Sequence, residues 1–85
     1  MSLYYQILTI YERTSLIGSR AEQITRGATS TLSADEMAGT KNAIEIAERE
    51  LNLKKIPLHV VRRMPSGVNV ELDPNDMSVI GEYTE

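Results

Sequence analysis

The chain has 85 residues and a formal net charge of −3, with a single histidine and no cysteine, tryptophan or phenylalanine. This composition excludes a disulfide framework, a cysteine-bound metal and a histidine-rich metal site. The negative net charge argues against a general affinity for nucleic acid. At this length we expect one small domain with an aliphatic core, which gains stability from a partner.

The sequence carries no targeting or membrane signal. Its first 25 residues contain no basic start followed by an apolar run, which is the pattern of a secretory signal. No segment approaches the roughly 20 apolar residues of a membrane-spanning helix. Because the absence of cysteine also fits a reducing compartment, we expect a soluble intracellular protein that does not bind membranes.

Residues 8–28 have the pattern of an amphipathic helix with defined ends. Thr9 is a favourable N-cap residue, and Glu12 stands at the spacing of a capping box. Gly27 allows a positive φ just after the last turn and marks the end. Between these ends, alternating steps of four and three residues predict one narrow buried stripe, formed by Ile10, Thr14, Ile17, Ala21, Ile24 and Ala28.

Gly18 lies in the middle of this helix, where glycine costs roughly 1 kcal/mol relative to alanine. Two explanations remain open. Another backbone approaches the helix closely at this point, or the segment is a plain core helix with a weak position.

The middle of the chain predicts a linker and a second helix. Residues 29–41 are rich in small polar residues, and Ser33 and Glu36 have capping-box spacing for one helical turn. A second helix begins after Asn42 and ends before Pro57. Its expected apolar face consists of Ile44, Ala47 and Leu51, widened by Ala43, Ile46 and Leu53. Glu45 and Arg49 have the spacing of an exposed ion pair.

Beyond Pro57 the apolar period changes from that of a helix to that of a strand. Residues 58–63 and 68–72 alternate as two strands, and the Met64–Gly67 segment between them has the composition of a turn. Asp73 and Pro74 break the second strand. The sequence therefore predicts an α+β fold, with two helices joined by a linker, a two-stranded antiparallel hairpin and an irregular acidic C-terminal tail.

No arrangement of residues indicates catalysis. The chain has no phosphate-binding loop, dinucleotide turn or zinc spacing, and its one histidine, His59, lies on a predicted strand without a nearby nucleophile. We expect no catalytic residue, bound cofactor or metal.

The charges of the second half are unevenly distributed. Between residues 54 and 63 there are four basic residues and no acidic one, whereas residues 64–85 contain five acidic residues and no lysine or arginine. The two segments could pair within the chain or face different surfaces of a partner. A free-standing regulatory domain that binds nucleic acid through Lys54, Lys55, Arg62 and Arg63 is the alternative to a protein-interaction module.

Three blocks of the sequence follow one another along the chain. The first runs from Thr9 to Ala28 and reads T-x-Y-E-R-x-x-x-I-G-x-R-A-x-Q-I-x-x-G-A. The second, from Ile46 to Pro57, reads I-A-x-x-E-L-x-x-x-K-I-P. The third, from Arg62 to Gly67, reads R-x-x-P-x-G. In this order the blocks resemble the omega-type subunit of multisubunit RNA polymerases in its eukaryotic and archaeal form, and the third resembles the hairpin turn of the eukaryotic-type subunit.

The resemblance implies a non-catalytic subunit of DNA-dependent RNA polymerase that clamps the largest subunit and promotes assembly and stability of the transcribing enzyme. It implies contacts with other polymerase subunits, and with DNA or RNA only through the complex. By position, the residues that would bind the largest subunit are Thr9, Tyr11, Glu12, Arg13, Gly18, Arg20 and Gln23. Those with structural roles would be Ile24, Gly27, Ile46, Ala47, Leu51, Ile56, Pro57, Pro65 and Gly67.

Arg20 has two possible contacts under this resemblance, with the partner or with another helix of its own fold. The resemblance also divides the chain into an N-terminal extension of residues 1–7, an omega-type domain of residues 8–72 and an acidic tail of residues 73–85. It places the protein with the polymerase, in the nucleus or the cytoplasm.

The chain also departs from the family pattern. The long acidic N-terminal tail of the nuclear subunit is absent, and Ala28-Thr29 stands where Ala-Pro is common. The aromatic and acidic residues that usually follow the turn are replaced by Val68, Asn69, Val70 and Glu71. A divergent member from a large DNA virus, carried in the virion, would fit these departures.

Overall fold

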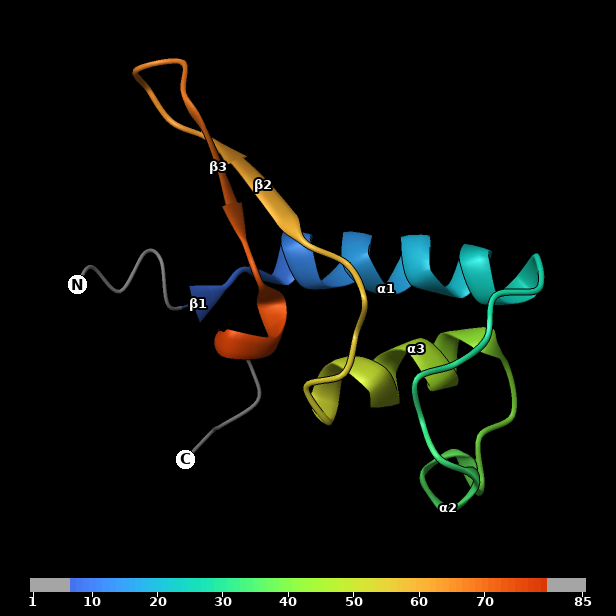
Figure 1. Ribbon diagram of the computed structural model, residues 1–85. Coiled ribbons are helices and arrows are strands. Elements are labelled where there is room, and N and C mark those ends of the chain that lie inside the picture. Colours follow the sequence, from blue (N-terminus) through green and yellow to red (C-terminus); the bar gives the residue numbers. More distant parts are fainter. Residues whose placement is uncertain (1–6, 80–85) are drawn as a thin grey trace.

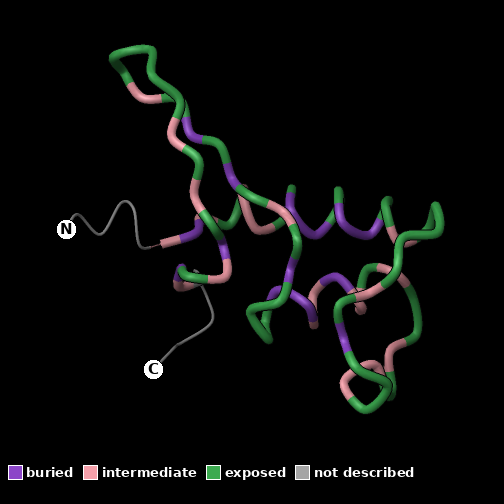
Figure 2. Tube along the Cα trace, in the orientation of Figure 1, coloured by how far each residue is buried: buried purple, intermediate pink, exposed green. Residues whose placement is uncertain are grey.

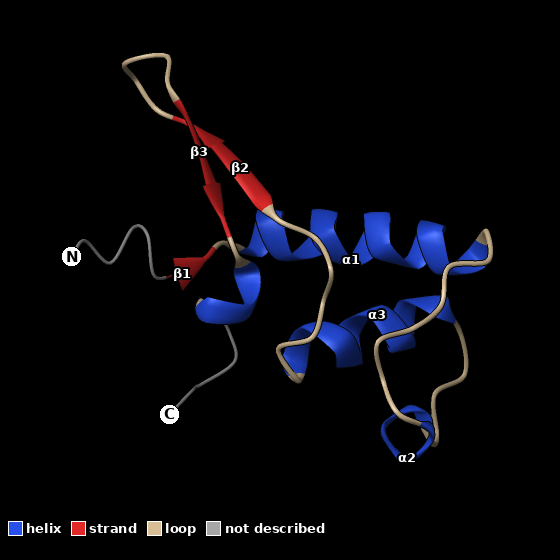
Figure 3. Ribbon diagram, viewed as in Figure 1, coloured by secondary structure: helices blue, strands red, loops and turns tan. Residues whose placement is uncertain are grey.

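The computed structural model describes residues 7–79, whose main helices, α1 (Ile10–Thr25) and α3 (Ala43–Asn52), lie side by side (Figure 1). The short helix α2 (Ala34–Met37) lies in the connection between them. The other elements are β1 (Ile7–Leu8), β2 (Val60–Arg63), β3 (Asn69–Leu72), the 3-10 turn η2 (Pro74–Asp76) and β4 (Ser78–Val79). Strands β2 and β3 form an antiparallel hairpin that projects beyond the helices (Figure 3). The predicted α+β class is confirmed.

Helix α1 has the ends that its sequence predicts. The backbone N–H of Glu12 donates to the Thr9 hydroxyl at 3.1 Å, and the Glu12 carboxylate accepts from the N–H of Thr9 at 3.0 Å, which completes the capping box. Gly27 follows the helix with a φ of 110°, in the region that favours glycine. Both the start and the stop signal therefore acted as expected.

The buried face of α1 differs from the predicted stripe at both ends. Ile10 is 61% exposed, and Thr14 and Ala28 are exposed as well. The buried residues of the helix are Leu16, Ile17, Arg20 and Ala21. Figure 1 shows α3 beneath the middle and C-terminal part of α1, so the first turn of α1 extends past the end of α3.

Helix α3 begins at the predicted cap, because Asn42 accepts a hydrogen bond from the N–H of Glu45 at 3.0 Å. Ala47 and Leu51 are buried as predicted. The prediction is wrong for two other residues of the apolar face, because Ile44 is 55% and Leu53 43% exposed.

Arg49 does not form the expected pair with Glu45. Its Nη1 atom donates instead to the carbonyls of Glu36 and Ala38, at 2.8 and 2.6 Å. These bonds hold the end of α2 against α3, and the single predicted turn after Ser33 is confirmed as α2.

The core is aliphatic, as the composition requires, and it lies where the two helices meet the strands (Figure 2). Its buried members are Leu8, Leu16, Ile17, Ala21, Ala47, Leu51, Ile56, Val60 and Met77. Leu8 comes from β1 and Met77 follows η2, so both ends of the described chain contribute to one core.

Residues 74–79 are more regular than the predicted irregular tail. Strand β4 pairs in parallel with β1, and Pro74 and Met77 are buried. The Asn75 amide binds the main chain of Ile56, accepting from its N–H at 3.0 Å and donating to its carbonyl at 2.9 Å. This segment therefore packs against the core through Met77. The rest of the predicted tail and of the N-terminal extension lies outside the described residues.

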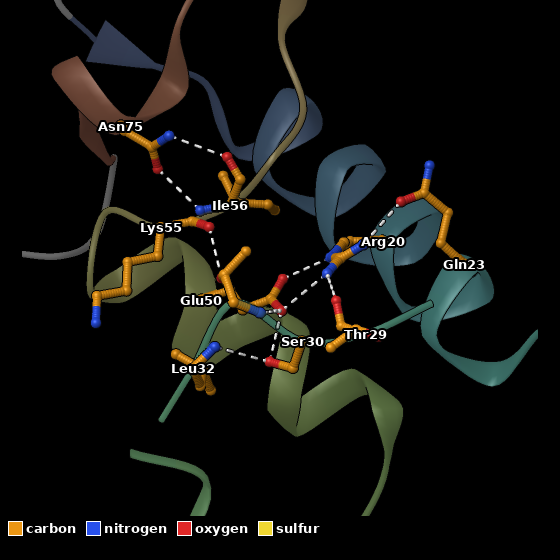
Figure 4. Close-up of polar contacts among 10 residues, drawn as sticks. Arg20, Gln23, Thr29, Ser30, Leu32, Glu50, Lys55, Ile56 and Asn75 are labelled. Atoms are coloured by element: carbon orange, nitrogen blue, oxygen red, sulfur yellow. Dashed lines mark hydrogen bonds and ion pairs between the residues drawn. The ribbon is translucent and has the colours of Figure 1, made fainter. Parts of the chain in front are cut away.

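A buried ion pair joins α1 to α3 (Figure 4). Arg20 is 3% exposed and Glu50 is fully buried. The guanidinium donates from Nε to Oε1 of Glu50 at 2.6 Å and from Nη2 to Oε2 at 3.1 Å. The Ser30 hydroxyl and the Thr31 N–H also donate to Oε2, at 2.8 and 3.1 Å. Burial raises the pKa of Glu50, but the bonds from Arg20, Ser30 and Thr31 together hold it below its usual value.

We expect Arg20→Ala to destabilise the domain strongly. The change leaves the Glu50 carboxylate buried without its cation, and breaking a buried pair in this way costs about 3–5 kcal/mol. Arg26→Ala is the matched control, because Arg26 forms an exposed pair with Glu22 whose loss costs about 0.3–0.5 kcal/mol. Urea denaturation of both variants measures the difference, and similar losses would contradict the role of the buried pair.

The lowered pKa of Glu50 also predicts a pH dependence of the free energy of unfolding. Because the folded-state pKa lies below the unfolded value of 4.5, the unfolded chain takes up the proton more readily. The contribution of the ionised Glu50 to the free energy of unfolding is complete above about pH 5 and is lost as the pH falls through its folded-state pKa. We expect stability to fall as the pH is lowered below about 5, and to fall less steeply in Glu50→Gln. Equal slopes in denaturant titrations at several pH values would refute this.

Candidate functional site

The start of α1 presents apolar side chains to solvent. Tyr11 is 80% exposed and Ile10 61%. Gly18 and Gln23 are exposed further along the helix, and Arg13 is half-buried. A Cβ atom at Gly18 would have no atom within 4 Å apart from its chain neighbours and the backbone of its own helix. Four of the residues predicted to bind the partner, Tyr11, Arg13, Gly18 and Gln23, are therefore at least partly accessible, and their binding role stays a prediction.

Two other predicted partner-binding residues, Thr9 and Glu12, form bonds within the domain. Besides its capping bond with Thr9, the Glu12 carboxylate binds Arg62 of β2 through Nε and Nη2, each at 2.7 Å. Arg62 is 5% exposed, and its Nη2 atom also donates to the carbonyl of Ile7 at 2.7 Å. The hydrogen bond from Arg62 is the main cause that lowers the pKa of Glu12, against the opposing effect of burial. This pair fastens the hairpin to the first turn of α1.

Arg20 makes the second of its two predicted contacts, with another helix of its own fold. Its bonds reach Glu50, the Gln23 side chain at 3.0 Å and the carbonyl of Thr29 at 2.9 Å. With 3% of its surface exposed, Arg20 lies within the domain and not on its surface.

The residues predicted to have structural roles fall into three groups. Ala47, Leu51 and Ile56 are buried, and Ile24 and Ile46 are half-buried. Gly27 and Gly67 adopt a positive φ, of 110° and 92°. Pro57 and Pro65 are exposed, at the residue after Ile56 and in the hairpin turn respectively.

A groove of about 560 Å³ lies between the N-terminal half of α1 and β2. Its α1 wall includes Tyr11, Ser15 and Ser19, and its other wall is formed by residues 58–63. No pattern in the sequence indicated this groove. It exists because Glu12 and Arg62, which are 50 residues apart, hold the two walls together.

The basic segment does not form one exposed patch. Lys54 donates to the carbonyl of Met77 at 2.7 Å, and Lys55 pairs with Glu36 at 2.7 Å. Arg62 is buried against Glu12, whereas Arg63 is exposed. His59 lies 2.9 Å from Glu71 across the hairpin. These pairings within the chain do not support the nucleic-acid-binding alternative, which needs the four cations on one accessible surface.

A metal site and a membrane-spanning helix each have requirements that the described residues do not meet. Among residues 7–79, no three metal-ligating side chains of the histidine, aspartate or glutamate type come together. None of the helices within this part of the chain has the length and apolar character needed to span a bilayer.

Several known proteins are similar to this chain. A sequence model of the family described as RNA polymerase Rpb6 matches residues 3–58. The "DNA-directed RNA polymerases I, II, and III subunit rpabc2" of Dictyostelium discoideum is 38% identical over 72 residues, which are 85% of this chain and 52% of that protein. The "DNA-directed RNA polymerase subunit Rpo6" of Thermofilum pendens is 43% identical over 60 residues, which are 71% of this chain and 72% of that protein.

A third relative is the "Probable DNA-directed RNA polymerases I, II, and III subunit RPABC2" of Caenorhabditis elegans, 40% identical over 76 residues. The chain spans about half the length of the two eukaryotic relatives, 52% and 53%. The family match includes α1, α3 and both partners of the Arg20–Glu50 pair. The chain therefore belongs to the RNA polymerase Rpb6 family, the omega-type family that its two helices resemble.

Proposed function

We propose that this chain is a non-catalytic subunit of a DNA-dependent RNA polymerase that clamps the largest subunit and promotes assembly of the enzyme. The match to the Rpb6 family over residues 3–58 carries this proposal. The relatives from Dictyostelium and Thermofilum are named as polymerase subunits. The chain would contribute no catalytic residue and no cofactor, and would meet DNA or RNA only through the complex.

The geometry of α1 supports a role in protein binding. Tyr11 and Ile10 expose apolar surface at the start of the helix, and Gly18 leaves open space two turns later. Ion pairs fix this helix on two sides, through Glu12 to the hairpin and through Arg20 to α3. A surface held in one conformation loses little entropy when a partner binds, which favours affinity.

The direct test is co-expression with the largest polymerase subunit from the same source. We expect the tagged chain to purify with that subunit, and to raise the yield of assembled enzyme in reconstitution. A Tyr11→Ala and Ile10→Ala double variant removes exposed apolar area and should weaken the complex. Ile44→Ala is the matched control, since Ile44 is also exposed but lies on α3. If the unaltered chain purifies with no polymerase subunit, the proposed function is wrong.

The substitution Gly18→Ala should have opposite effects on the stability of the free chain and on its affinity for the partner. In the free chain the added methyl group enters open space, and we expect stabilisation by up to about 1 kcal/mol through the higher helix propensity of alanine. In the complex the methyl group should clash where the partner backbone approaches, at a cost of about 1–3 kcal/mol.

Thermal unfolding of the free variant and its affinity for the largest subunit measure the two effects. Unchanged or improved affinity would place Gly18 outside the interface. Lower stability of the free chain would contradict the open space around Gly18.

A further inference from the structure

The outer edge of β2 carries main-chain groups that the hairpin does not use. The N–H of Met64 donates to the carbonyl of Val68 at 2.8 Å, in register with the β2–β3 ladder. Hydrogen-bonded and non-hydrogen-bonded pairs alternate along an antiparallel ladder. The N–H and C=O groups of Val61 and Arg63 therefore point away from β3, towards the other edge of β2.

The groove beside α1 follows this edge. Every residue from 58 to 63 lines it. Since successive side chains of a strand point to opposite faces, a groove that touches six consecutive residues runs along the main chain of the strand. Ser15 and Ser19 on the opposite wall have short side chains, which leave room for a second main chain. An extended segment that lies along β2 would therefore contact the lining of this groove along the whole strand.

The side chains at this edge define the chemistry of such a segment. Val61 is 62% exposed, and Arg63 is exposed and forms no salt bridge with any residue between 7 and 79. Directly opposed residues of paired strands interact through their side chains. An added strand would therefore complement this edge if it placed an apolar residue beside Val61 and an acidic residue beside Arg63.

We propose that an extended segment of another polymerase subunit adds to β2 as a third strand of the β2–β3 sheet, with this apolar and acidic pattern. The inference rests on the proposed function, because it takes the partner from the same complex. A second copy of this chain is a less suitable occupant, because its own β2 edge is flanked by its own α1, which would have to approach the first α1.

The test removes one hydrogen-bond donor at this edge. The full chain is prepared by chemical ligation with N-methylvaline at position 61, which deletes an N–H that the hairpin ladder does not use. Its affinity is measured for a polymerase assembled from the other subunits without this chain. We expect affinity to fall at least about fivefold, because the added strand loses a main-chain hydrogen bond and meets a methyl group.

N-methylation of Glu71 is the matched control. Glu71 is paired with Val61 across the hairpin, so its N–H points outward at the opposite edge, away from the groove. This variant should bind as the unmodified chain does. Nuclear Overhauser cross-peaks between the amide protons of Arg62 and Val70, recorded by NMR for both variants, verify that the hairpin is retained.

Equal affinities of the two N-methyl variants would overturn strand addition, while binding by the unmodified chain would leave the proposed function intact. Strand addition by another subunit would also be overturned if the unmodified chain forms a dimer that N-methylation at Val61 dissociates, because the occupant of the edge would then be a second copy.

A second test changes a side-chain charge and leaves the backbone of β2 unaltered. Arg63→Glu should weaken binding at least about fivefold, whereas Arg26→Glu, an exposed change at the far end of α1, should not. Equal effects of these two changes would contradict an acidic partner segment.

Discussion

The buried pair between Arg20 and Glu50 is the interaction on which the arrangement of the helices depends. The Glu50 carboxylate of α3 receives donors from Arg20 of α1 and from Ser30 and Thr31 in the segment between α1 and α2, so three segments meet at two oxygen atoms. Taking both charges out of water is expensive, and an aliphatic pair could give equal or greater stability. The main contribution of the pair is therefore to select one relative position of α1 and α3, because few other helix registers would satisfy every donor and acceptor. The described part of the chain leaves no buried side-chain polar atom without a partner.

The Glu12–Arg62 pair applies the same principle at the other end of α1. It couples the hairpin, which as an isolated pair of strands would be marginal, to the first turn of a helix that is already capped by the same carboxylate. Because Glu12 serves both as a cap and as a partner of Arg62, the start of the helix and the angle of the hairpin are set together. The exposed side chains of Tyr11 and Ile10 are presented from a segment fixed in this way.

Local signals in the sequence predicted the elements well and their long-range contacts less well. Thr9, Gly27 and Asn42 marked helix ends correctly, because caps depend on residues within one turn. The contact of Arg20 with another helix was one of two predicted possibilities, but Glu50 was not identified as its partner, although a signal existed. The spacing from Ala43 to Ala47 and Glu50 follows four- and three-residue steps, which place Glu50 on the buried face of α3. Arg20 is adjacent in sequence to Ala21, which lies on the buried face of α1. Strand β4 is two residues long and pairs with residues about 70 positions away, so it had no periodicity to detect.

An open strand edge is usually a liability, since it invites pairing with other chains. This domain limits the risk in two ways: β2 has four residues, and its exposed end carries the charge of Arg63. The wall of α1 adds a third restriction, because it leaves only a groove beside this edge. That wall stays in place through the Glu12–Arg62 pair, whose carboxylate also caps α1. The contact that orients the hairpin thus also determines what can reach the edge of β2, so stability and selectivity at this edge have a common physical origin.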